Sequence, residues 1–273
     1  MKFSFKITAT ALVLAAVTSL SCKKSTTQEF VTAKETISSA LGKQLAMDLY
    51  RSVSGGVKNN NILKTDASQK GKTAVNTTQE CGLPSVYFTD STGVHGDTTR
   101  AYKGKTIFTS MCNGVYNNNW NVDAYLLADT LKTTEKGNGF SNIYDVTLNY
   151  DVRALDYGYR QISINGVTTT SSYKSKISNG VVTESHKMET VYSLLRISAF
   201  RTAWNPKYVD GRVYFSTKTL DTDSSTGAKG VANAYNGYME FYSNDTMKAF
   251  FDLKNGSYKV FQTNLLTGET KEL

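Results

Sequence analysis

From Cys81 to the end of the chain, apolar and polar residues alternate with a period of two over long stretches. The clearest case is YDVTLNYDVRA, where the residues from Tyr144 to Ala154 at even positions are mainly apolar and those between them are mainly polar. Because successive side chains of a strand point to opposite faces, this stretch predicts one long strand with one face on a core and one in water.

Four dipeptides between alternating runs are typical of hairpin turns: Asn165-Gly166, Asn179-Gly180, Asn244-Asp245 and Asn255-Gly256. Alternation and turns together predict about ten strands. They are expected over 85–90, 100–111, 122–134, 141–155, 159–165, 167–177, 181–199, 211–220, 236–251 (with a turn inside) and 257–264. The connections are short and the strands are longer than the usual five or six residues. We therefore expect a mainly β fold, a single antiparallel meander that forms a curved sheet, half-barrel or barrel.

A different period marks residues 32–56, which we expect to form one N-terminal α-helix. Thr32 and Glu35 have capping-box spacing, and Gly55 with Gly56 is expected to end the helix. Apolar residues recur every four positions at Ile37, Leu41, Leu45 and Leu49. This stripe predicts a face that docks on the main domain; a partner helix or a membrane surface is the alternative. Residues 57–80 are polar and are expected to be a flexible linker.

The first 21 residues have the layout of a secretory signal peptide. Lys2 and Lys6 precede an uncharged apolar stretch from Ile7 to Leu20, which is short for a membrane span. The signal ends at Cys22 and so resembles the lipobox of bacterial lipoproteins. That resemblance implies cleavage before Cys22, a lipid on its thiol and a lipidated tether over 22–31. The alternative is an ordinary signal with Cys22 unmodified.

The net charge of +8 is unevenly distributed. Residues 23–79 hold nine Lys or Arg against four Asp or Glu, whereas residues 80–273 hold twenty against nineteen. A nucleic-acid-binding protein would need a basic face on the folded part, so no nucleic-acid partner is expected. A basic tether beside an acyl chain suits anionic headgroups, so the expected partner is the membrane, reached through the lipid anchor.

Two cysteines remain if Cys22 is acylated. An exported protein meets an oxidising compartment, where leftover cysteines usually pair. We therefore expect a disulfide between Cys81 and Cys112; two buried free thiols are the alternative.

No motif in the chain predicts catalysis, a metal site or a cofactor. His95 and His186 are the two histidines, and no spacing typical of zinc ligands surrounds them. Ser171 and Lys174 have S-x-x-K spacing, but they lie in a strand-like run rather than at the start of a helix. A hydrolase would require clustered carboxylates, or a His brought against a Ser or Asp in a cleft, for example at His186.

Aromatic residues are the most suggestive surplus, with 17 Tyr, 12 Phe and 2 Trp. Trp120 lies in an Asn-rich turn, and Trp204 and Tyr208 lie in an expected loop. Exposed rings beside amides can stack on sugars or hold apolar ligands. These three are candidate ligand-binding residues, and core packing at the ends of the sheet is the alternative.

Several segments together, among them GDTTRAYKGK, GFSNIYDVTLNYDV and NGSYKVFQTNLLTG, resemble a group of lipoproteins of unknown function from Gram-negative bacteria. The resemblance covers residues 81–268 and implies an envelope location and an all-β domain over 81–273. We expect a non-enzymatic outer-membrane lipoprotein, on the periplasmic side, that binds a lipid-like ligand or a protein on its curved sheet, as lipoprotein carriers do. The alternative is a glycan-binding surface lipoprotein; a hydrolase is the least favoured hypothesis.

Overall fold

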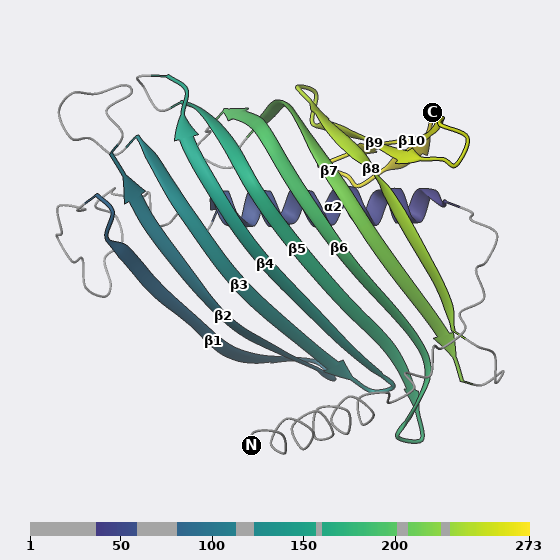
Figure 1. Ribbon diagram of the computed structural model, residues 1–273. Helices are drawn as coiled ribbons and strands as arrows, with labels where there is room; N and C mark the ends of the chain where they lie inside the picture. The colour runs from purple at the N-terminus through teal and green to yellow at the C-terminus, as the bar shows by residue number, and fades with distance from the viewer. Residues whose placement is uncertain (1–36, 59–80, 113–122, 157–159, 201–206, 225–229) are drawn as a thin grey trace, which may run out of the picture. The chain divides into compact units, whose positions relative to one another are not determined.

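The computed structural model describes residues 37–58, 81–112, 123–156, 160–200, 207–224 and 230–273 (Figure 1). They form one antiparallel sheet of eleven strands and one helix, α2 (Ser39–Lys58). The strands are β1 (Pro84–His95), β2 (Thr98–Met111), β3 (Ala124–Gly137), β4 (Phe140–Ala154), β5 (Gln161–Ser178), β6 (Val181–Phe200), β7 (Lys207–Asp223), β8 (Val231–Tyr242), β9 (Thr246–Asp252), β10 (Tyr258–Asn264) and β11 (Thr270–Glu272).

The strands pair in chain order, so the expected antiparallel meander is confirmed. The sheet is open, because β1 and β11 form its two edges and do not pair with each other. Three of the four expected turns connect strands: Asn179-Gly180 joins β5 to β6, Asn244-Asp245 joins β8 to β9, and Asn255-Gly256 joins β9 to β10. The short strand β11 was not expected.

The fourth expected turn, Asn165-Gly166, is wrong, because these residues lie inside the single strand β5. The pairing with β6 shifts register between Ile164 and Gly166, which is a β-bulge. Gly166 has a φ of +146°, and a Cβ there would meet the carbonyl oxygen of Asn149 at 2.0 Å. At this bulge the backbone of β5 lies so close to β4 that only glycine fits at position 166.

Helix α2 begins after Ser38. The Ser38 hydroxyl accepts a hydrogen bond from the Leu41 amide at 3.2 Å, as an N-cap does. The expected capping residues Thr32 and Glu35 lie outside the described residues. The helix also continues through Gly55 and Gly56 to Lys58, beyond its expected end.

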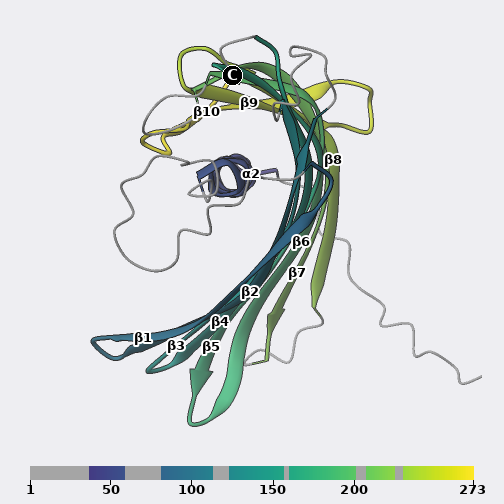
Figure 2. The same cartoon turned by 90° about the vertical axis from the view of Figure 1, so that its left-hand side faces the viewer.

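The apolar stripe of α2 docks on the sheet, as expected. Leu45, Leu49 and Val53 are fully buried and belong to one core with the facing strands. Figure 2 shows α2 inside the curve of the sheet, with β9 and β10 passing over it. The approach is close: a Cβ on Gly42 would meet the ring of Phe261 in β10 at 3.0 Å. The core therefore lies between α2 and the concave face. None of the described helices is long and apolar enough to cross a membrane.

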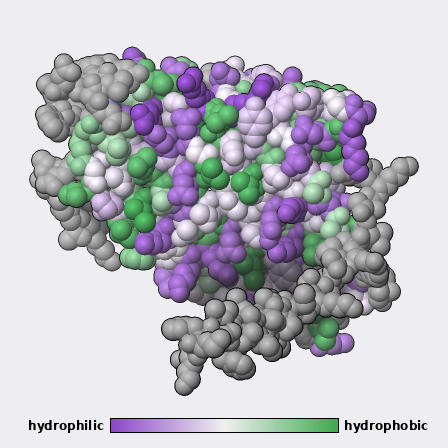
Figure 3. All heavy atoms as spheres, in the orientation of Figure 1, coloured by the Kyte–Doolittle hydropathy of each residue, from purple (hydrophilic) through white to green (hydrophobic). Residues whose placement is uncertain are grey.

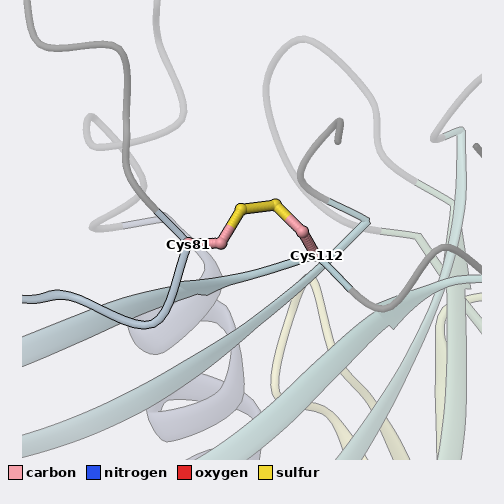
Figure 4. Close-up of a disulfide and its surroundings, with 2 residues drawn as sticks. All are labelled: Cys81 and Cys112. Atoms are coloured by element: carbon pink, nitrogen blue, oxygen red, sulfur yellow. A yellow bond between two sulfur atoms is a disulfide. The ribbon is translucent and has the colours of Figure 1, made fainter. Parts of the chain in front are cut away.

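The Cys81–Cys112 disulfide is present, as expected (Figure 4). The two Cα atoms lie 5.6 Å apart, within the ordinary range for a disulfide. Cys81 precedes β1 and Cys112 follows β2, so the bond joins the open ends of this edge hairpin.

The convex face carries apolar and polar residues interspersed, as Figure 3 shows. On it an aromatic row crosses β7, β8 and β9. The Tyr238 ring stacks on Phe250 with centroids 4.5 Å apart, and the Arg212 guanidinium lies 4.5 Å from the Tyr238 centroid. Tyr238 therefore packs against two neighbours, and these contacts connect β7, β8 and β9 on the outer face of the sheet.

Candidate binding groove on the concave face

The apolar alternation of β4 extends further than α2 covers. Leu148, Tyr150 and Val152 are buried, whereas Tyr144 and Val146 on the same face are only half-buried. The helix fills one part of the concave face, and the remaining apolar positions of β4 are left at the edge of a hollow.

This hollow is a groove of about 510 Å³ between α2 and strands β3, β4 and β5. The helix contributes six residues: Lys43, Gln44, Met47, Asp48, Arg51 and Ser52. The strands contribute apolar Leu131, Val146 and Leu148, and polar Asp129, Tyr144, Ser172 and Lys174. Its volume lies in the range of small-molecule sites, and an apolar floor with a few polar groups is typical of them.

Asp48 is a buried carboxyl group between the helix and the sheet. Burial raises the pKa of Asp48 to about 6, although Arg51, Lys174 and a hydrogen bond from Gln44 act in the opposite direction. Burial, with a contribution from Asp48, also raises the pKa of Tyr144. These groups therefore lie close enough to influence one another's charge.

The strand part of the groove presents a hydroxyl group with no partner. Ser172 is 5% exposed, and its Oγ makes no hydrogen bond within the described part of the chain. Buried hydroxyl groups are usually hydrogen-bonded. Tyr144 is the register partner of Ser172 on β4, and Lys174 is two residues along the same face of β5.

Three cationic side chains surround the groove: Lys43, Arg51 and Lys174. Among the described residues, no carboxylate lies within ion-pairing distance of any of them. Asp129 lines the same groove and accepts a hydrogen bond from the Thr106 hydroxyl at 2.9 Å. Burial raises the pKa of Asp129 as well.

Beyond the groove, one transverse row of register partners crosses six strands of the concave face. Its members are Arg100, Glu135, Asn142, Lys174, His186 and Asp221. Arg100 pairs with Glu135, whose other oxygen accepts a hydrogen bond from Asn142 at 3.2 Å. This polar row separates the apolar part of the concave face from the far end of the sheet.

The structure brings His186 against Asp221, which meets one condition of the hydrolase hypothesis. The Nδ1 of His186 lies 2.6 Å from Oδ1 of Asp221, in a second hollow of about 470 Å³. Ser185 does not complete a triad, because it faces the other side of the strand and its hydroxyl bonds that of Thr222 at 2.6 Å. Within the described residues, no hydroxyl group is hydrogen-bonded to the His186 ring. Among the residues that the structure describes, the pair therefore has no hydroxyl group placed as a nucleophile.

The other candidate residues are placed as follows. Trp120 and Trp204 lie outside the described residues, and Tyr208 is described only as part of β7. The glycan hypothesis thus stays a prediction. His95 ends the edge strand β1. No group of three or more His, Cys, Asp or Glu that could hold a metal ion occurs in the ranges that the structure describes.

Sequence reasoning missed the groove residues Asp48, Arg51 and Ser172, and it considered Lys174 only for its S-x-x-K spacing with Ser171, which does not line the groove. One signal was available: Asp48 lies within the predicted helix on the flank of its apolar stripe, and a carboxylate so close to a docking face is unusual. Nothing in the local pattern distinguishes Ser172 from other polar strand residues or relates Lys174 to the helix.

Searches against protein-family models, curated proteins and solved structures each returned no match. The resemblance to envelope lipoproteins therefore stays a prediction. The function has to be argued from the geometry of this chain.

Proposed function

We propose that the protein is a lipid-anchored, non-enzymatic component of the bacterial envelope that binds a lipid-like ligand in the groove between α2 and the concave face. The observation that carries the proposal is the groove itself. Leu131 and Val146 are half-buried and, with the buried Leu148, form an apolar floor that α2 leaves partly open.

An acyl chain suits this floor better than a compact polar ligand does. The three apolar side chains come from neighbouring strands, with Leu131 opposite Val146 in the β3–β4 register. Met47 of α2 lines the same groove, and its flexible thioether adapts to an apolar ligand of variable shape. Burial of an extended apolar chain would supply most of the binding free energy.

The envelope location rests on the N-terminal sequence. A signal ending at Cys22, followed by a basic segment, would hold the domain beside the outer membrane, on its periplasmic side. A lipid anchor and a lipid-binding groove would then act at the same surface. Labelling cells with radioactive palmitate tests the anchor: the wild-type protein should be labelled, and a Cys22→Ala variant should be unlabelled and released from membranes.

Binding is tested with a neutral apolar dye, phenylnaphthylamine, whose fluorescence rises in apolar sites, and with hexadecanol as the competitor. The wild-type protein should bind the dye and release it to hexadecanol. Val146→Asp places a charge on the groove floor and should abolish binding. Thr147→Asp is the matched control, because Thr147 is exposed on the opposite face of the same strand.

Circular dichroism confirms that both variants are folded. Equal dye binding by wild type and Val146→Asp would place the dye elsewhere, and the absence of any binding by wild type would remove the proposal.

A further inference from the structure

Besides its apolar floor, the groove has polar groups, and one of them is a buried hydroxyl group. Ser172 Oγ is buried and unpartnered within the described residues, and it lines the groove next to Lys174. A buried hydroxyl without a partner costs free energy unless something bonds it when the protein is at work. This observation points to a polar atom supplied by a ligand.

The sign of that ligand's charge follows from the cations around the groove. Lys43, Arg51 and Lys174 all line it, and no described carboxylate forms an ion pair with them. Two acidic groups, Asp48 and Asp129, line it as well. Burial raises the pKa of both, so it favours their neutral forms, and Asp48 is largely neutral below about pH 6. With three cations against at most two carboxylates, the lining of the groove carries a net positive charge.

We propose that the groove binds a single-chain anionic amphiphile, with its anionic head held by Lys174, Arg51 and the Ser172 hydroxyl and its chain on Leu131, Val146 and Leu148. This inference rests on the proposed function and specifies its ligand class. A cationic head would add to the excess of positive charge in the groove, a neutral head would leave that excess unchanged, and an anionic head would offset it.

The dimensions of the groove agree with this placement. Lys174, Ser172 and Thr170 succeed one another on one face of β5, and Thr170 is opposite the half-buried Val146. Two residues of a strand rise by about 6.6 Å, so about 13 Å separate the level of Lys174 from that of Val146. A long acyl chain can extend over this distance, away from the polar row that contains Lys174.

The test compares ligands that share one chain and differ in the head: palmitate, hexadecyl phosphate, hexadecanol and hexadecyltrimethylammonium. Each ligand is titrated as a competitor against phenylnaphthylamine bound to the wild-type protein. We expect at least one anion to bind about tenfold more tightly than hexadecanol, since hydrogen bonds to charged groups are the stronger kind, and the cation to bind more weakly. The comparison of palmitate with the phosphate identifies the head.

Lys174→Gln and Arg51→Gln should each reduce the preference for the anion and leave hexadecanol binding unchanged. Lys132→Gln is the control, because Lys132 is exposed on the convex face of β3. With hexadecyl sulfate, whose head stays ionised, binding should strengthen as the pH falls through about 6, and Asp48→Asn should remove this dependence.

The outcomes separate the two proposals. Equal binding of hexadecanol and both anions would overturn the inference and leave the proposed function intact. An anion preference that survives in both Lys174→Gln and Arg51→Gln would also overturn it, because the head would then lie elsewhere. Failure of all four ligands to bind would overturn the proposed function itself.

Discussion

The phenol of Tyr192 in β6 donates a hydrogen bond to the main-chain carbonyl of Leu45 in α2, with 3.1 Å between the oxygens. Both residues are fully buried, and 147 positions separate them in the chain. The contact ties the middle of the helix to the centre of the concave face. It therefore fixes the distance between the two walls of the core, and the groove opens beside it.

Removal of this hydroxyl should destabilise the fold modestly. We expect Tyr192→Phe to lower the free energy of unfolding by about 1 kcal/mol, because the ring stays packed and the helix carbonyl keeps its intrahelical partner. Tyr87→Phe is the control, since Tyr87 is 47% exposed. Urea unfolding followed by circular dichroism measures both, and an equal effect of the two changes would contradict the role given to the Tyr192 hydroxyl.

A methyl group at Gly166 should be much more costly. Gly166→Ala would force a Cβ against the Asn149 carbonyl at a φ that alanine rarely adopts, so we expect a loss of at least about 2 kcal/mol. Gly93→Ala is the matched control, because Gly93 lies in a strand with nothing within 4 Å of the added carbon. Thermal unfolding distinguishes them, and a Gly166→Ala protein as stable as Gly93→Ala would mean that the bulge relaxes freely.

The same residue shows where sequence reasoning stopped. Asn165-Gly166 has the local composition of a turn, and so do the three dipeptides that do form turns. What decides its conformation is long-range: Gly166 pairs with Tyr150 on one side and Leu194 on the other. The alternation of β5 on both sides of the bulge was visible, but the register between strands was not.

The site was less predictable than the fold. Period-two alternation identified the apolar face of β4, and the four-residue stripe identified the docking face of α2. Neither pattern says how much of the sheet the helix covers, and the groove exists because Val146 and Tyr144 continue beyond that cover. The cluster of Asp48 and Lys174 joins positions 126 residues apart, and no local signal relates them.

The disulfide should stabilise the β1–β2 edge. Cys81 and Cys112 close a loop of 31 positions, which by chain-entropy reasoning contributes about 3–4 kcal/mol. We expect the Cys81→Ser, Cys112→Ser double variant to lose this much free energy of unfolding and so to unfold at a lower urea concentration. Reductant should lower the wild-type midpoint to the same value. Reductant should leave the double variant unchanged. A wild-type midpoint that does not respond to a reductant in excess would show that the bond does not support the fold.

The buried carboxyl of Asp48 should make stability depend on pH in a defined direction. Its pKa is about 6 in the folded protein and 3.8 in the reference state, so the folded state binds its proton more tightly than the unfolded state. Stability from this group is therefore full below about pH 4, declines as the pH rises to about 6, and stays low above that. The shift corresponds to roughly 2–3 kcal/mol.

Asp48→Asn keeps the shape and removes the charge, so it should abolish this decline and make the protein more stable than wild type near neutral pH. Asp145→Asn, on the convex face of β4, should leave the pH profile of wild type unchanged. Urea unfolding from about pH 4 to about pH 7 measures all three proteins. If wild type and Asp48→Asn lost stability in parallel over this range, Asp48 would not be the buried acid that the structure shows, and the charge balance of the groove would have to be derived anew.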